Sequence, residues 1–214
     1  CSLVLLFDEF DVLSGPKKKH AAATFFPYLR ALLARDLVRL QFVFVIGRNL
    51  DDRNNIALSL FKGTPYRRVS LLDREDTVKL VRLSQSNGTL AWPDEAVERV
   101  WRLTHGHPFL TQRLCSDVWE RAYDQEPEMP PSVSSADVDA AVPDALEASR
   151  NTLEWLWDGL GPAERVVTSA LAKAGPGPIG EDELGQRLRE SGVRILIREL
   201  QHAPQLLQEW DILE

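Results

Sequence analysis

The sequence has little of what supports a secreted or a membrane-spanning protein. Its only cysteines are Cys1 and Cys115, far apart among 214 residues, so a disulfide framework is not indicated and a cytoplasmic location is expected. No apolar run approaches the roughly 20 residues of a membrane-spanning helix, and we expect no membrane partner. Acidic residues outnumber basic ones by 32 to 25, which argues against a chain whose main task is to neutralise a nucleic-acid backbone.

The strongest positive feature is an apolar run that ends in two acids. Residues 3–7 are uninterrupted apolar residues, and Asp8 and Glu9 follow them directly. Such a run is typical of a strand that is buried on both faces of a parallel sheet. Ligands of open α/β sheets bind outside the carboxyl ends of strands, so the two acids stand where chemistry is expected. The alternative is an ordinary buried strand that meets a polar loop.

A second apolar run follows a predicted helix. Apolar residues at three- to four-residue spacing predict a helix over residues 21–35, and residues 41–46 predict a second buried strand. A strand, helix, strand unit of this length makes the two strands parallel. Arg48 and Asn49 are therefore expected at the same edge of the sheet as the two acids. An arginine that simply leaves a strand for solvent is the alternative.

The corner at residues 104–108 predicts a change of direction between two helices. Gly106 fits the position after a helix cap, and Pro108 fits the first position of the next helix. His105 and His107 form a His-x-His pair without a cysteine or carboxylate cluster beside it. We therefore favour capping or hydrogen bonding over metal binding for the two histidines.

The remaining patterns predict an all-α part after the α/β part. Residues 125–135 hold three prolines and three serines and are expected to be a linker. The predicted domains are an α/β core (1–72), a helical lid (73–124), a linker with a connecting helix (125–159) and a winged-helix-like domain (160–214). The predicted elements are helices over 50–61, 73–84, 108–123, 143–157, 181–190 and 193–202, helices that start near residues 94 and 161, and strands over 66–72 and 210–213.

Four segments together resemble a prokaryotic STAND-type, AAA-like family of P-loop ATPases. They read FDEFD at 7–11, FFPYL at 25–29, FVIGR at 44–48 and THGHPFLTQRLC at 104–115. The resemblance implies the C-terminal part of a P-loop ATPase sheet with its helices, then a helical lid and a truncated winged helix. It implies a Walker B pair in which Asp8 holds Mg²⁺ and Glu9 polarises the attacking water. It also implies Arg48, with Asn49 second, as sensor 1, and Gly106 and Pro108 as a Gly-x-Pro motif against adenine.

The resemblance implies a switch that binds and hydrolyses ATP and controls an effector or oligomerisation. The sequence contains no Gly-x-x-x-x-Gly-Lys-Ser/Thr loop, so we expect a fragment that is inactive without its parent protein. An AAA+ initiator-like ATPase with a DNA-binding winged helix is the first alternative. Residues 160–214 hold six basic and nine acidic residues, which disfavours it, and Arg194 and Arg198 are its candidate DNA contacts. An inactive interaction scaffold is the second alternative.

Overall fold

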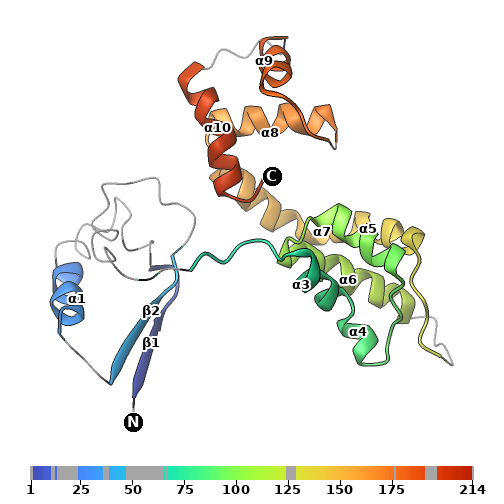
Figure 1. Cartoon of the computed structure of the whole chain (residues 1–214), viewed down its shortest axis with the longest axis horizontal. Coiled ribbons are helices and arrows are strands. Elements are labelled where there is room, and N and C mark those ends of the chain that lie inside the picture. The colour runs from blue at the N-terminus through green and yellow to red at the C-terminus, as the bar shows by residue number, and fades with distance from the viewer. Residues whose placement is uncertain are drawn as a thin grey trace. The chain divides into compact units, whose positions relative to one another are not determined.

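The chain forms two compact units, Cys1–Arg68 and Val69–Glu214 (Figure 1). The computed structural model describes residues 2–10, 13, 24–35, 39–46, 65, 67–123, 129–175, 177–190 and 197–213. It is mostly helical in these ranges, with one small parallel sheet. None of the helices described there is long and apolar enough to cross a membrane. The predicted helix over 50–61 lies outside the described residues.

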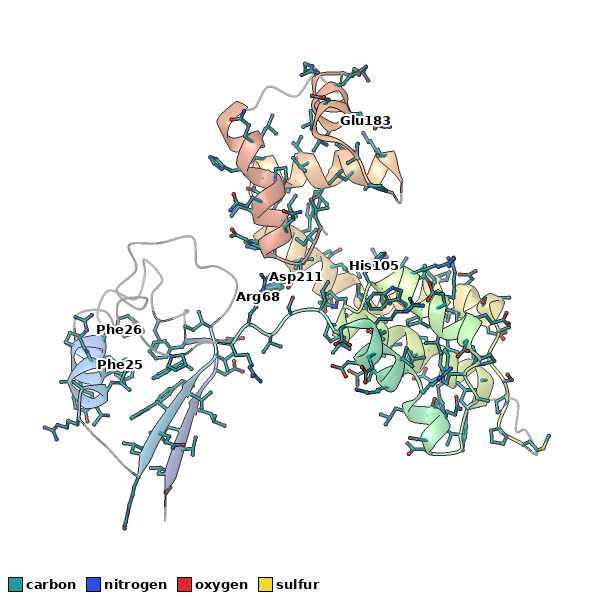
Figure 2. The ribbon with its side chains drawn as sticks, viewed as in Figure 1. Phe25, Phe26, Arg68, His105, Glu183 and Asp211 are labelled. Carbon is teal, nitrogen blue, oxygen red and sulfur yellow. The ribbon has the colours of Figure 1, made fainter. Side chains whose placement is uncertain are left out.

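The first unit is built on two parallel strands and a helix. Strand β1 (Leu3–Phe7) pairs with β2 (Leu40–Phe44) in a register that runs from Leu3 opposite Leu40 to Phe7 opposite Phe44. The predicted parallel pairing is therefore confirmed. Helix α1 (Phe26–Leu33) begins at Phe26, and Phe25 precedes it as the N-cap residue (Figure 2). Its buried residues pack with the phenylalanines of the strands in one core.

The prediction that β1 is buried on both faces is wrong for the described residues. Side chains alternate between the faces of a strand, and here one face carries Phe7 and Phe44 towards the α1 core. On the other face Leu6 is 73% exposed and Val43 is 46% exposed. One helix covers only one face of a sheet, so the apolar pattern of the second face has no cover in the described part of this unit.

The second unit contains a first helical core. It is made by α3 (Arg74–Val81), α5 (Asp94–Thr104), α6 (Pro108–Tyr123) and the first half of α7 (Ser135–Gly159). The short α4 (Leu83–Ser86) follows α3 and contributes no buried residue. Asp73 caps α3 as predicted, because its carboxylate accepts the N–H of Asp76 at 2.8 Å. The strand predicted over 66–72 is wrong: the described residues of this stretch form no strand.

Helix α7 begins eight residues earlier than the predicted helix over 143–157. Ser134 and Asp137 form a capping box, in which each side chain accepts a hydrogen bond from the backbone N–H of the other residue. Val138 and Ala141 then lie fully buried in the first helical core. Pro143 therefore lies inside the helix rather than at its start.

A second helical core follows. Helices α8 (Pro162–Ala174), α9 (Glu181–Glu190) and α10 (Ile197–Glu209) pack around Val167, Ala203 and Leu207. Helix α10 continues beyond the predicted end at residue 202. The strand predicted over 210–213 is wrong, because the chain turns back on α10 instead. There the N–H of Ile212 donates to the carbonyl of Leu207 at 2.9 Å.

Candidate functional site

Asp8 and Glu9 lie where β1 ends, as the sequence predicts. Both side chains are exposed, and the backbone N–H of Glu9 donates to Oδ1 of Asp8 at 2.9 Å. Glu9 has a φ of +49°, in the left-handed region that non-glycine residues seldom adopt. The chain therefore makes a sharp turn that presents two adjacent carboxylates at the end of a parallel strand.

Phe10 connects this turn to the core of the first unit. Its N–H donates to the carbonyl of Val45 at 3.0 Å, and the N–H of Val45 donates to the carbonyl of Phe7 at 2.8 Å, which continues the pairing beyond β1. The Phe10 ring is 2% exposed and lies 4.8 Å from the ring of Phe44 and 5.7 Å from that of Phe26. The Phe7 ring of β1 lies 6.0 Å away, so both strands and α1 contribute rings around Phe10 and tie the turn to the core of the unit.

The carboxylate of Asp8 fits a magnesium ligand in type and exposure. Magnesium takes oxygen ligands, keeps several waters and is usually held by one or two carboxylates together with substrate phosphates. Asp8 is one of two adjacent exposed carboxylates at the carboxyl end of a parallel strand, and its Oδ1 accepts the backbone N–H of Glu9. Arg48 and Asn49, the predicted sensor residues, lie outside the described residues.

The predicted corner between two helices is confirmed in the second unit. Helix α5 is capped by His105, which has a φ of +45°, and Gly106 follows with a φ of +73° (Figure 2). Pro108 is the first residue of α6. Nδ1 of His107 accepts the N–H of Leu110 at 3.4 Å, so this imidazole caps α6. In the described part of the chain, no three His, Cys, Asp or Glu side chains gather into a metal-binding group.

Gly106 also makes a close approach that the sequence does not reveal. A Cβ atom at this position would lie 2.1 Å from the carbonyl oxygen of Leu72 and 3.0 Å from the ring of Trp101. The carbonyl of Gly106 in turn accepts the N–H of Leu72 at 2.8 Å. Glycine is therefore needed here both for its backbone conformation and for the space that it leaves to the chain entering α3.

A hollow of about 540 Å³, which the sequence does not predict, lies between α3 and α5. Its rim is an ion-pair network in which Glu98 accepts from Arg74 at 2.5 Å and from Arg102 at 3.0 Å. Arg82 pairs with Asp94 across the same two helices. The sequence signal of this rim is the four-residue spacing of charged residues: Arg74 and Arg82 lie two such steps apart, and Asp94, Glu98 and Arg102 follow one another at single steps. That signal does not tell which helix faces which.

The comparisons with known proteins find only distant similarity, among solved structures. No family model and no curated protein matches the chain. A solved structure of the DNA clamp loader delta protein of Bacillus subtilis matches with 14% identity and a TM-score of 0.32. The alignment covers 99% of this chain and 72% of that protein. A likeness of this size carries no argument for a shared function.

Proposed function

We propose that this chain is part of a STAND-type, AAA-like ATPase that acts as a nucleotide-dependent switch. The observation that carries the proposal is the turn at Asp8 and Glu9. Two adjacent exposed carboxylates follow a parallel strand, and one of them is held in a left-handed conformation. Uncommon backbone conformations concentrate at functional sites, because only a surrounding structure that fixes them keeps them in place.

In this proposal each residue has a distinct role. Asp8 holds Mg²⁺, and the bound Mg²⁺-ATP supplies the phosphoryl group and the charge neutralisation for its transfer. Glu9 orients and polarises the water that attacks. Arg48, or else Asn49, contacts the γ-phosphate, and the corner at Gly106 and Pro108 receives the base. The 214 residues contain no phosphate-binding loop, so a longer chain has to supply it.

The helical unit provides the moving parts of the proposed switch. Residues 73–124 act as the lid, and residues 160–214 act as a winged-helix-like module that holds the closed state until a ligand or partner releases it. The output is then an effector or a change of oligomeric state. The net negative charge of residues 160–214 favours this role over DNA binding.

The test compares ATP binding and hydrolysis by the full-length parent protein and its Glu9→Gln variant. We expect the variant to bind ATP with a dissociation constant within about threefold of the parent. We expect its turnover to fall by about 10²- to 10⁴-fold, the contribution typical of a positioned general base. Glu120→Gln, an exposed substitution on α6, is the matched control and should leave both quantities unchanged.

Two results would contradict the proposal. If the parent protein binds no nucleotide, the two acids are a strand end, and the interaction-scaffold alternative holds. If Glu9→Gln hydrolyses ATP as fast as the parent protein, Glu9 has no catalytic role. Asp8→Asn adds a separate check, because it should weaken the Mg²⁺-dependent part of ATP binding and leave the remaining affinity unchanged.

A further inference from the structure

The second half of helix α7 carries an exposed apolar line. Helix α7 leads from the first helical core, whose last member in sequence is Ala145, to the second helical core, which starts at Leu160 (Figure 1). Between these two residues Leu146 is 53% exposed and Trp157 is 38% exposed. A shallow groove of about 640 Å³ follows the line from Pro143 to Asp158, and all of its lining residues belong to α7. We call it the α7 groove.

The spacing along α7 explains why the line is continuous. Residues that are three or four positions apart lie on the same face of a helix. The line follows this rule with steps of four, three and four: Leu146, Arg150, Leu153 and Trp157. It extends over about 17 Å, because each residue adds about 1.5 Å to the length of a helix. Three apolar side chains and the stem of one arginine thus form a surface as long as three helical turns.

Three carboxylates follow one side of this line. Each comes one position after a member of the line, so all three lie on the same flank of the helix: Glu147, Glu154 and Asp158. Glu147 pairs with Arg150, and Asp158 lies 3.4 Å from Arg165. Both are ion pairs between largely exposed groups, which contribute little and can be exchanged for a partner's cation. The groove itself is lined by three acids and one arginine, a net charge of −2.

We propose that the α7 groove docks an amphipathic helix of a partner protein, with an apolar face and basic flanks. An amphipathic helix offers apolar side chains at the same three- to four-residue steps as the line on α7. Lysines or arginines beside that apolar face meet the carboxylate flank. A second copy of this chain fits less well, because it brings the same acidic flank and like charges oppose pairing. The inference does not depend on nucleotide binding.

The test titrates a labelled synthetic peptide with the whole 214-residue chain and follows fluorescence anisotropy. The peptide is helical, with leucines at steps of four, three and four and lysines on both sides of them. A scrambled peptide of the same composition lacks the leucine line. We expect the ordered peptide to bind at least about tenfold more tightly than the scrambled one. Its dissociation constant should rise with salt, because the flanking contacts are exposed.

Two variants locate the site on α7. Leu146→Gln removes an apolar member of the line and should weaken binding of the ordered peptide by about tenfold. Leu83→Gln on α4 is its matched control, because Leu83 is similarly exposed at 58%. Glu154→Lys reverses a charge on the flank and should weaken binding by about fivefold at low salt. Glu120→Lys makes the same change at an exposed position of α6. Both controls should stay within about twofold of the wild type, and circular dichroism checks the helical content of every variant.

Four results would overturn the proposal. The first is that the ordered peptide does not bind at concentrations up to about 1 mM. The second is that the scrambled peptide binds equally well, which would show attraction by charge alone. The third is that Leu146→Gln and Glu154→Lys bind as the wild type does. The fourth is a dimer in sedimentation equilibrium that Leu146→Gln dissociates, because a second copy then covers the groove. None of these results bears on ATP hydrolysis, so the two proposals can fail separately.

Discussion

Arg165 closes the C-terminal end of α7, and its removal should cost far more than its ion pair is worth. The last carbonyls of a helix have no partner within the helix. Nε of Arg165 donates to the carbonyls of Trp157 and Leu160, both at 3.0 Å, and its terminal nitrogen donates to the carbonyl of Asp158 at 3.0 Å. The guanidinium also lies 5.7 Å from the centre of the Trp157 ring. One side chain of α8 thus satisfies three carbonyl groups at the junction with α7.

The expected size of the effect follows from these contacts. A hydrogen bond from a charged donor contributes about 1.5–3 kcal/mol when buried. The Arg165 side chain is 38% exposed, so water replaces part of each lost bond and we take about 0.5–1 kcal/mol for each. Three bonds and a partly exposed cation–π contact of about 0.5 kcal/mol give about 2–3.5 kcal/mol for Arg165→Met. This substitution keeps the apolar stem and removes only the donors.

The free energy of unfolding is measured by urea titration. Amide exchange in α8 and α10 is measured as well, because these two helices belong to the second helical core. Asp158→Asn is the matched control, because it removes only the ion pair at 3.4 Å between exposed groups and should cost less than about 0.5 kcal/mol. Arg165→Lys should fall between the two, since an ammonium group reaches fewer of the carbonyls. If Asp158→Asn costs as much as Arg165→Met, or if Arg165→Met costs less than about 0.5 kcal/mol, the bonds from Arg165 to the three carbonyls do not stabilise the end of α7.

Three further predictions follow from single residues. Burial raises the pKa of the Cys115 thiol to about 12. In a Cys1→Ser variant at pH 8, Ellman's reagent should therefore react about 10³-fold more slowly in the native state than in urea, and equal rates would contradict this burial. Hydrogen bonds from Ser134 lower the pKa of Asp137, so the capping box stabilises the fold above pH 4 and weakens as the pH falls through the lowered pKa. Ser134→Ala should cost about 1 kcal/mol in urea unfolding at pH 7 and less at pH 3, whereas a constant cost would refute the linkage. Glu9→Gly should raise the stability of the first unit by about 1 kcal/mol in the same assay, and a loss of stability would show that Glu9 is not strained.

Local signals predicted the elements whose boundaries depend on neighbouring residues. The strand, helix, strand pattern gave the parallel pairing of β1 and β2, since only a crossover of that length fits between them. The cap at Asp73 and the corner at Gly106 and Pro108 were also predictable, because capping chemistry acts within a few residues. In each of these cases the residues that determine the helix end or the strand pairing are close in sequence to the element that they determine.

Proline misled the prediction of α7, and a terminal apolar run misled the prediction of the C-terminal end. Pro143 was interpreted as a helix start, yet the capping box at Ser134 and the buried Val138 begin the helix eight residues earlier. Trp210 and Ile212 were assigned to a strand, but their N–H groups donate back to carbonyls of α10. A strand needs a partner, and no local signal reports whether one is present.

Contacts between residues that are far apart in sequence could not be predicted, and they include the contacts around the candidate site. The rim of the hollow between α3 and α5 requires Arg74 to face Glu98 and Arg82 to face Asp94. Each partner lies on a different helix, so periodicity within one helix cannot pair them. The approach of Leu72 to Gly106 is of the same kind, because it joins residues 34 positions apart that no local pattern links.

These contacts bear differently on the two motifs to which the proposed function assigns a role. Gly106 and Pro108 are fully accounted for by the close approach of Leu72 and by the start of α6, so their presence does not by itself require a nucleotide. Glu9 is different. A φ of +49° favours glycine or asparagine, and the side chain of Glu9 is exposed rather than packed, so neither backbone nor core explains a glutamate there. The hydrolysis assay with Glu9→Gln therefore weighs more in deciding for an ATPase than any measurement on the Gly-x-Pro corner.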